Sequence, residues 1–197
     1  GSDAVAGVVN FIMNDKFEGV QIDANLSGYN HQQGNDSVQK LVRARNFAVP
    51  GDKSFDAKSK DVSILMGGNF ADGKGNATVY AGFKQDDPLL QSERDFTSCA
   101  LGSSAAGFAC SGSGTSFPGR FLLDNADLTV GSTGTRNYNG ALDAYNFGPI
   151  NYLQRPSNRY VFNATANYDI NDKVQVYSSI GFHNDHTVAQ IAPSGLF

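Results

Sequence analysis

The chain has 197 residues, 22 of them glycine and none tryptophan, and charged residues make up 17% of it. That share lies below the roughly 25% that is typical of soluble domains. Fifteen basic and 19 acidic residues give a net charge of −4. This mild acidity argues against nucleic acid as a partner, because nucleic-acid binding needs a concentrated basic surface. No run reaches the roughly 18 apolar residues of a transmembrane helix, which excludes a helical membrane protein.

Alternation of apolar and polar residues is the dominant pattern along the chain. In the first run, Val20 and Ile22 alternate with Gln21 and Asp23. The same pattern predicts strands at 20–27, 62–70, 77–84, 160–168 and 174–183. Each is roughly ten residues long, the length that a tilted strand needs to cross the hydrocarbon layer of a membrane.

Short and long connections alternate between these strands along the chain. Residues 72–75 and 171–173 form tight turns, whereas about 31–60 and 88–157 form long connections. Transmembrane barrels have short periplasmic turns and long extracellular loops. A compact soluble domain rarely contains a structureless connection longer than about 15 residues. We therefore predict that the tight turns lie at one end of the sheet and the long connections at the other.

These patterns predict an all-β fold: about five antiparallel up-and-down strands of an incomplete transmembrane β-barrel, with long extracellular loops. In that fold lipid would contact Val20, Ile22, Val79, Phe83, Phe162, Ala164, Val176 and Ile180. The lumen would contain Gln21, Asp23, Thr78, Tyr80, Asn163, Thr165, Gln175 and Tyr177. A soluble β-sandwich alternates in the same way, because its apolar face is a core beneath a second sheet. Alternation by itself leaves both folds open.

Five short segments carry a resemblance to a known family. Residues 1–10 read GSDAVAGVVN, 17–20 read FEGV, 69–76 read NFADGKGN, 145–156 read YNFGPINYLQRP and 168–172 read YDIND. The first two resemble the end of the plug domain and the entry into the first barrel strand in TonB-dependent outer-membrane receptors. The third resembles the first periplasmic turn of these receptors, and the fourth the end of a loop before a downward strand.

The resemblance implies a barrel of about 22 strands with a plug domain inside it. Residues 1–15 would be the C-terminal remnant of the plug, and 16–197 the N-terminal part of the barrel. Such receptors lie in the outer membrane of Gram-negative bacteria and take up a scarce nutrient, such as a ferric siderophore, a vitamin or an oligosaccharide. The implied partners are outer-membrane lipid, a small-molecule or glycan ligand, and the TonB energy-transducing complex, which a missing N-terminal part would contact.

Cys99 and Cys110 are the two cysteines, and both lie in one segment rich in glycine, serine and alanine. Such a pair forms a disulfide in an oxidising compartment or remains as two thiols in the cytosol. For an exported protein we expect the disulfide. Neither a histidine nor a second cysteine pair lies nearby, which disfavours a metal site.

The long connection at 88–157 contains the best candidates for ligand contact. Side chains that could hydrogen-bond to or stack on a siderophore or glycan are Arg136, Tyr138, Tyr145, Asn146 and Tyr152. The alternative is that the same side chains pack between loops.

We expect neither a catalytic site nor a cofactor or metal site. His183 and His186 are three positions apart on a predicted strand, so their imidazoles would diverge instead of sharing a metal. The glycine-rich stretch 112–115 lacks the Gly-Lys-Ser/Thr sequence of a phosphate loop. Asp86 and Asp87 are interpreted as solvated strand-end charges. Transport is thus the predicted function, and the alternatives are a soluble or secreted β-sandwich binding module and a secreted hydrolase.

Overall fold

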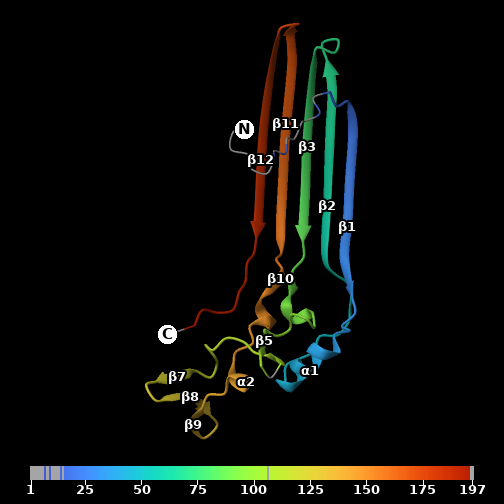
Figure 1. Ribbon diagram of the computed structural model, residues 1–197. Coiled ribbons are helices and arrows are strands. Elements are labelled where there is room, and N and C mark those ends of the chain that lie inside the picture. The colour runs from blue at the N-terminus through green and yellow to red at the C-terminus, as the bar shows by residue number, and fades with distance from the viewer. Residues whose placement is uncertain (1–6, 8, 10–13, 15, 106, 196–197) are drawn as a thin grey trace. The chain divides into compact units, whose positions relative to one another are not determined.

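The computed structural model of the chain describes residues 7, 9, 14, 16–105 and 107–195. The chain divides into two compact units, which we call the strand unit and the loop unit. The strand unit comprises Gly1–Asn25, Lys60–Lys84 and Asn158–His186. The loop unit comprises Leu26–Ser59, Gln85–Ser157 and Thr187–Phe197. Long strands build the strand unit, whereas most of the short strands and helices belong to the loop unit (Figure 1).

The long strands form one five-stranded sheet in the order β1-β2-β3-β11-β12. They are β1 (Gly19–His31), β2 (Lys53–Phe70), β3 (Gly75–Asp86), β11 (Ser157–Asn171) and β12 (Val174–Thr187). Adjacent strands run in opposite directions, so the sheet is antiparallel (Figure 1). The five predicted strands are confirmed, and each is longer than predicted. Because β2 begins at Lys53, the prediction that the first long connection reaches residue 60 is wrong.

Both tight turns are present, and both lie at the same end of the sheet. Between β2 and β3, Ala71, Asp72 and Gly73 take positive φ angles of 52°, 55° and 82°, which bend the chain within one turn. Between β11 and β12, the side chain of Asn171 accepts a hydrogen bond from the amide of Lys173 at 2.9 Å. The long connections start and finish at the opposite ends of the same strands.

The two faces of the strand unit differ in polarity, as the alternation predicts. On one face the rings of Phe83 and Tyr160 lie 5.0 Å apart, and those of Phe70 and Tyr168 lie 6.0 Å apart. On the other face the side chains of Asn69 and Asn76 form a hydrogen bond of 2.7 Å. We call these the apolar face and the polar face.

The sheet is open along both edges in the part of the chain that the structure describes. β1 and β12 each have a single neighbouring strand. The short strands form separate sheets and do not extend this one. The fold is therefore antiparallel and mostly β. The predicted plug remnant at 1–15 falls outside the described residues except at Gly7, Val9 and Asn14.

The first long connection contains helix α1 (Asp36–Ala44), which the strand pattern did not predict. The side chain of Asn35 caps its N-terminus by accepting a hydrogen bond from the amide of Val38 at 3.3 Å. Val42 is fully buried and contacts the two cysteines. Apolar side chains packed around this cluster are Val38, Leu41, Phe47 and Val49.

The second long connection also contains regular structure. β5 (Leu101–Ser104) pairs with β6 (Gly107–Cys110), and β10 (Tyr152–Gln154) pairs with β4 (Leu89–Leu90). A three-stranded sheet contains β7 (Arg120–Leu123), β8 (Ala126–Gly131) and β9 (Gly134–Asn137). Single-turn helices are η1 (Gln91–Glu93), α2 (Gly140–Asp143) and η2 (Gly148–Ile150).

Candidate membrane-facing surface and loop sites

The apolar face of the strand unit is open instead of packed beneath other elements. Ile22 on β1 is 67% exposed and Ile180 on β12 is 64% exposed. Other large exposed side chains at apolar-face positions are Val20, Val62, Met66, Phe70, Tyr160, Phe162, Ile170, Val174, Val176 and Phe182. An apolar patch that spans several strands indicates a surface for a membrane or a partner, since monomeric soluble proteins rarely expose one of this extent.

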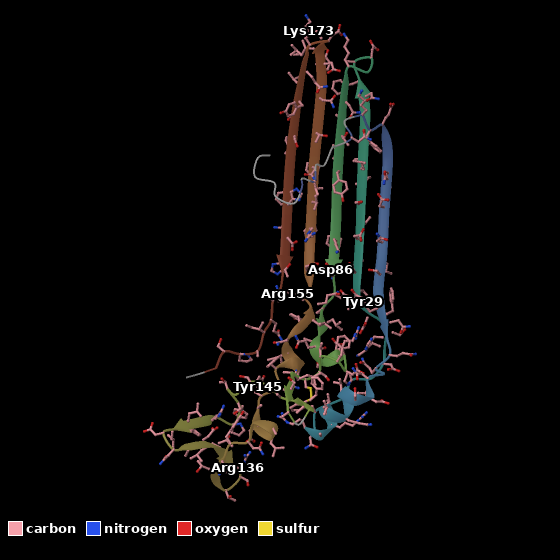
Figure 2. The ribbon with its side chains drawn as sticks, viewed as in Figure 1. Tyr29, Asp86, Arg136, Tyr145, Arg155 and Lys173 are labelled. Carbon is pink, nitrogen blue, oxygen red and sulfur yellow. A yellow bond between two sulfur atoms is a disulfide. The ribbon has the colours of Figure 1, made fainter. Side chains whose placement is uncertain are left out.

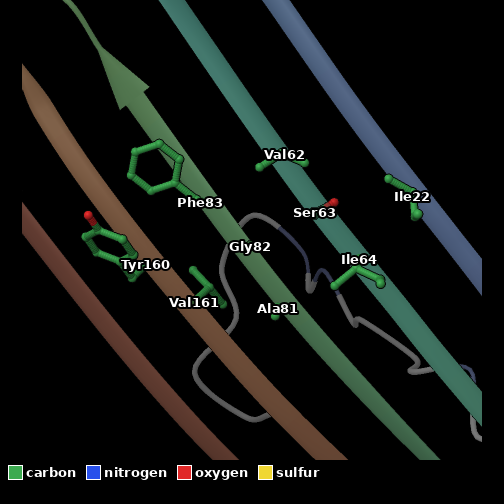
Figure 3. Close-up of a pocket in the computed structure, with 9 residues that line it drawn as sticks. All are labelled: Ile22, Val62, Ser63, Ile64, Ala81, Gly82, Phe83, Tyr160 and Val161. Carbon is green, nitrogen blue, oxygen red and sulfur yellow. The ribbon is translucent and has the colours of Figure 1, made fainter.

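A groove of about 490 Å³ lies on the apolar face. Figure 3 places Ala81 and Gly82 at its centre, with larger side chains on both sides. The complete lining is Ile22, Val62, Ser63, Ile64, Ala81, Gly82, Phe83, Tyr160 and Val161. The groove is thus a hydrocarbon-lined depression in the middle of the sheet.

The polar face of the strand unit carries charged and hydroxylated side chains. Asp61, Ser63, Tyr80 and Lys84 line one hollow of about 260 Å³ together with Arg159. The Arg159 guanidinium forms an ion pair of 2.6 Å with Asp185 on the neighbouring strand β12. This face therefore suits contact with water or with polar protein groups.

In the loop unit, two buried polar groups hold distant segments together. Arg94 is 3% exposed and binds both carboxylate oxygens of Asp56, at 2.8 and 2.6 Å. Asp95 is 1% exposed and accepts hydrogen bonds from the Asn35 amide at 2.8 Å and from Gln39 Nε2 at 3.1 Å. Burial opposes the charged carboxylate of Asp95, but these hydrogen bonds hold its pKa below the usual value.

Cys99 and Cys110 are joined by a disulfide, with their Cα atoms 5.6 Å apart. Both cysteines are buried against Val42 of α1. The Arg45 guanidinium, just beyond α1, donates to the Cys110 carbonyl at 2.8 Å and to the Ala144 carbonyl at 2.8 Å. The disulfide and Arg45 therefore connect α1, the β5–β6 hairpin and the segment after α2.

The five predicted ligand residues all lie in the loop unit, and Figure 2 labels Arg136 and Tyr145. Arg136 forms a two-pronged ion pair with Asp143 at 2.7 and 2.6 Å. That guanidinium, together with a hydrogen bond from the Asn139 amide, lowers the pKa of Asp143 to about 2. The Tyr138 ring lies 4.1 Å from the Arg120 guanidinium.

The remaining three candidates are also used within the loop unit. Tyr145 exchanges two backbone hydrogen bonds of 2.9 Å with Ser113. The Asn146 amide donates to the Ser98 carbonyl at 2.8 Å. Tyr152 pairs with Leu90 across the two short strands. These contacts fit the packing alternative, and ligand contact stays a prediction.

Sequence reasoning missed the buried pair of Arg94 with Asp56 and the carboxylate of Asp95. Asp56 precedes Arg94 by 38 positions, and Asn35 precedes Asp95 by 60. No short stretch of sequence therefore contains both partners of either contact. Helix α1 did have a local signal. Asn35 is followed by apolar residues at Val38 and Leu41, the spacing of one helical face.

The residues at 7, 9, 14, 16–105 and 107–195 contain no group of three or more histidine, cysteine or acidic side chains placed to hold a metal ion. No helix among these residues is both long and apolar enough to cross a membrane.

No protein family, curated protein or solved structure matches this chain. The resemblance to TonB-dependent receptors therefore gains no support from comparison with known proteins.

Proposed function

We propose that the chain is part of an outer-membrane transporter of the TonB-dependent receptor type. In this proposal the strand unit lies in the membrane as an arc of the β-barrel, with its apolar face toward lipid. The observation that carries the proposal is the open apolar face, which includes Ile22 and Ile180 and has polar residues on the opposite side of the same strands. A barrel in a membrane needs this arrangement, because its outer surface contacts lipid and its interior is polar.

Strand length supports the same placement. The five long strands have 13, 18, 12, 15 and 14 residues. A tilted strand needs about 9 to 11 residues to cross the hydrocarbon layer. Each strand is therefore long enough to span the layer, with residues to spare at its ends.

The open edges of the sheet agree with a barrel that further strands complete. β1 and β12 are first and fifth in the sheet and run in the same direction (Figure 1). An antiparallel closure between them requires an odd number of additional strands. The total is then even, as in bacterial single-chain barrels. We assign those strands to the rest of the receptor.

The proposed role of the whole receptor is uptake of a scarce nutrient: a ferric siderophore, a vitamin or an oligosaccharide. The loop unit would lie outside the cell, and the TonB complex would supply energy through a part of the receptor outside residues 1–197. This chain would contribute barrel wall and loop surface and would not catalyse a reaction. The disulfide between Cys99 and Cys110 fits an oxidising compartment.

The membrane placement is tested with two arginine substitutions in the complete gene product. Val79→Arg puts a charge on the apolar face of β3, where the mid-membrane cost is about 2 to 4 kcal/mol. Thr78→Arg puts the same charge on the polar face of the same strand. We expect Val79→Arg to abolish assembly in the outer-membrane fraction and Thr78→Arg to assemble.

If both variants remain soluble and folded without detergent, the proposal is wrong, and a soluble binding module takes its place. Uptake is tested separately with three radiolabelled probes: ferric ferrichrome, cyanocobalamin and maltoheptaose. Cells with the intact gene should accumulate one of them faster than cells with the gene deleted. Equal accumulation of all three would refute these nutrient classes without affecting the membrane placement.

A further inference from the structure

The groove on the apolar face has the shape and surface of a hydrocarbon site. Its centre is low because the side chain of Ala81 is small (Figure 3). In the same view Val62 lies on the neighbouring strand β2, and Phe83 lies further along β3. Beside Phe83, the Tyr160 ring lies 5.0 Å away and widens the aromatic wall. A flexible apolar chain would lie along this depression in contact with its apolar lining.

One end of the groove borders a cation. Lys60 precedes Val62 by two positions on β2, so both side chains are on the same face of the sheet. Similar positions on β11 and β12, which do not adjoin β2 in the sheet, are Asn158 before Tyr160 and Asn184 after Phe182. Lys60 is exposed, and none of the ion pairs found among the described residues includes it. The groove therefore has a positive charge near this end.

We propose that the groove binds one acyl chain of an anionic membrane lipid and that Lys60 binds the phosphate of its headgroup. The proposal rests on the proposed function, since the groove meets lipid only if the strand unit lies in a bilayer. The apolar lining accounts for the acyl chain. The charge of Lys60 accounts for the headgroup, because one lysine near a lipid surface favours an anionic lipid by about fivefold.

The test uses benzoylphenylalanine, a photo-crosslinking analogue of phenylalanine, at one position at a time. Phe83 lines the groove, whereas Phe182 lies on the apolar face outside the lining residues and is 58% exposed. The complete gene product is placed in nanodiscs made of equal parts phosphatidylglycerol and phosphatidylcholine. After irradiation, mass spectrometry identifies which lipid is attached at each position.

At position 83 we expect about five phosphatidylglycerol adducts for each phosphatidylcholine adduct. At position 182 we expect nearly equal amounts. Lys60→Gln should bring the ratio at position 83 to parity. Lys173→Gln removes the same charge at the tight turn between β11 and β12, so it should leave that ratio unchanged.

Each other outcome has a definite meaning. Lipid adducts with equal headgroup ratios at both positions would overturn the groove proposal and leave the membrane placement intact. The absence of lipid adducts at both positions would overturn both. A preference for phosphatidylglycerol that survives Lys60→Gln would reject Lys60 as the headgroup contact.

Discussion

The strand unit and the loop unit differ in whether they bury apolar side chains, since all the buried apolar residues of the described chain belong to the loop unit. In the strand unit, Ile22 and Ile180 are 67% and 64% exposed. In the loop unit, Val42 is 0% exposed and Cys110 is 2% exposed. One chain thus contains a sheet that leaves its apolar face open and a region that buries a small core of its own.

The two units therefore depend on different contacts. The loop unit gains stability from a buried cluster, a disulfide and buried ion pairs, all of which are internal. The strand unit gains little from burial, because the chain itself leaves its apolar face uncovered. If the proposed function is right, lipid supplies that missing contact. Changes inside the loop unit should then leave membrane assembly of the strand unit intact.

Arg94→Ala should have the largest effect on the loop unit. It leaves the Asp56 carboxylate, which is 19% exposed, without the guanidinium that binds both of its oxygens. Breaking a buried ion pair in this way costs about 3 to 5 kcal/mol. We expect rapid protease cleavage between residues 88 and 157, with normal recovery in the membrane fraction.

Arg120→Ala is the matched control for that variant. It removes the same type of side chain from the ion pair with Asp127, in which the arginine is 28% exposed and the aspartate 39% exposed. Exposed ion pairs contribute little to stability. Cleavage as fast as in Arg94→Ala would show that burial is not the source of the difference.

Replacing both Cys99 and Cys110 with serine should have the next largest effect. The disulfide closes a loop between positions 11 apart in the sequence. Its loss should destabilise the loop unit by up to about 3 kcal/mol through the entropy of the unfolded chain. Hydrogen exchange should rise in α1 and in the β5–β6 hairpin while β11 and β12 stay protected. Equal loss of protection in the long strands would contradict the separation of the two units.

Gly112→Ala should destabilise the loop unit by about 1 to 3 kcal/mol, the usual cost of overpacking. A Cβ at this position would collide with the backbone carbonyl of Tyr145. Gly34→Ala is the control, because a Cβ there meets nothing within 4 Å. Thermal unfolding of the loop unit, followed by protease sensitivity, should separate the two. Equal midpoints would mean that the backbone at Tyr145 adjusts freely.

The smallest effect should come from acidification. In the folded chain the pKa of Asp143 is lowered from 3.8 to about 2 by Arg136 and by the Asn139 amide. The ion pair therefore adds stability above the unfolded value and loses it as the pH falls toward 2. A carboxyl titration by NMR should place the midpoint of Asp143 near 2. A midpoint at 3.8 would mean that Arg136 and Asp143 are not paired in solution.

The sheet was predictable because its signals are local. Val20 and Ile22 alternate with polar neighbours, and Asp72 and Gly73 mark a turn, so short windows of sequence contain the information. The start of β2 was missed because the residues from Lys53 to Ser59 are mostly polar and contain positive φ angles at Phe55 and Ala57. These two residues interrupt the regular alternation.

The loop unit was poorly predictable because its contacts are distant in sequence. Asp95 meets Gln39 across 56 positions, and Arg45 meets the Ala144 carbonyl across 99. No window shorter than these separations contains both partners. Helix α1 was missed for another reason. Its apolar residues Val38, Leu41 and Val42 have the spacing of a helix, which does not match the two-residue repeat that predicts strands.

The neighbouring positions of β3 and β11 in the sheet have a consequence for the rate of folding. The β2–β3 and β11–β12 hairpins each close within a few residues, and isolated hairpins form in about 1 to 10 μs. β3 and β11, in contrast, are separated in sequence by the segment from Leu89 to Pro156, and they pair only after this segment has brought them together. Long-range pairing of this kind is slow. Early folding of the loop unit around Val42 and the disulfide would shorten the time that β3 and β11 need to pair. The folding of the loop unit would thereby set the rate at which the two halves of the sheet join.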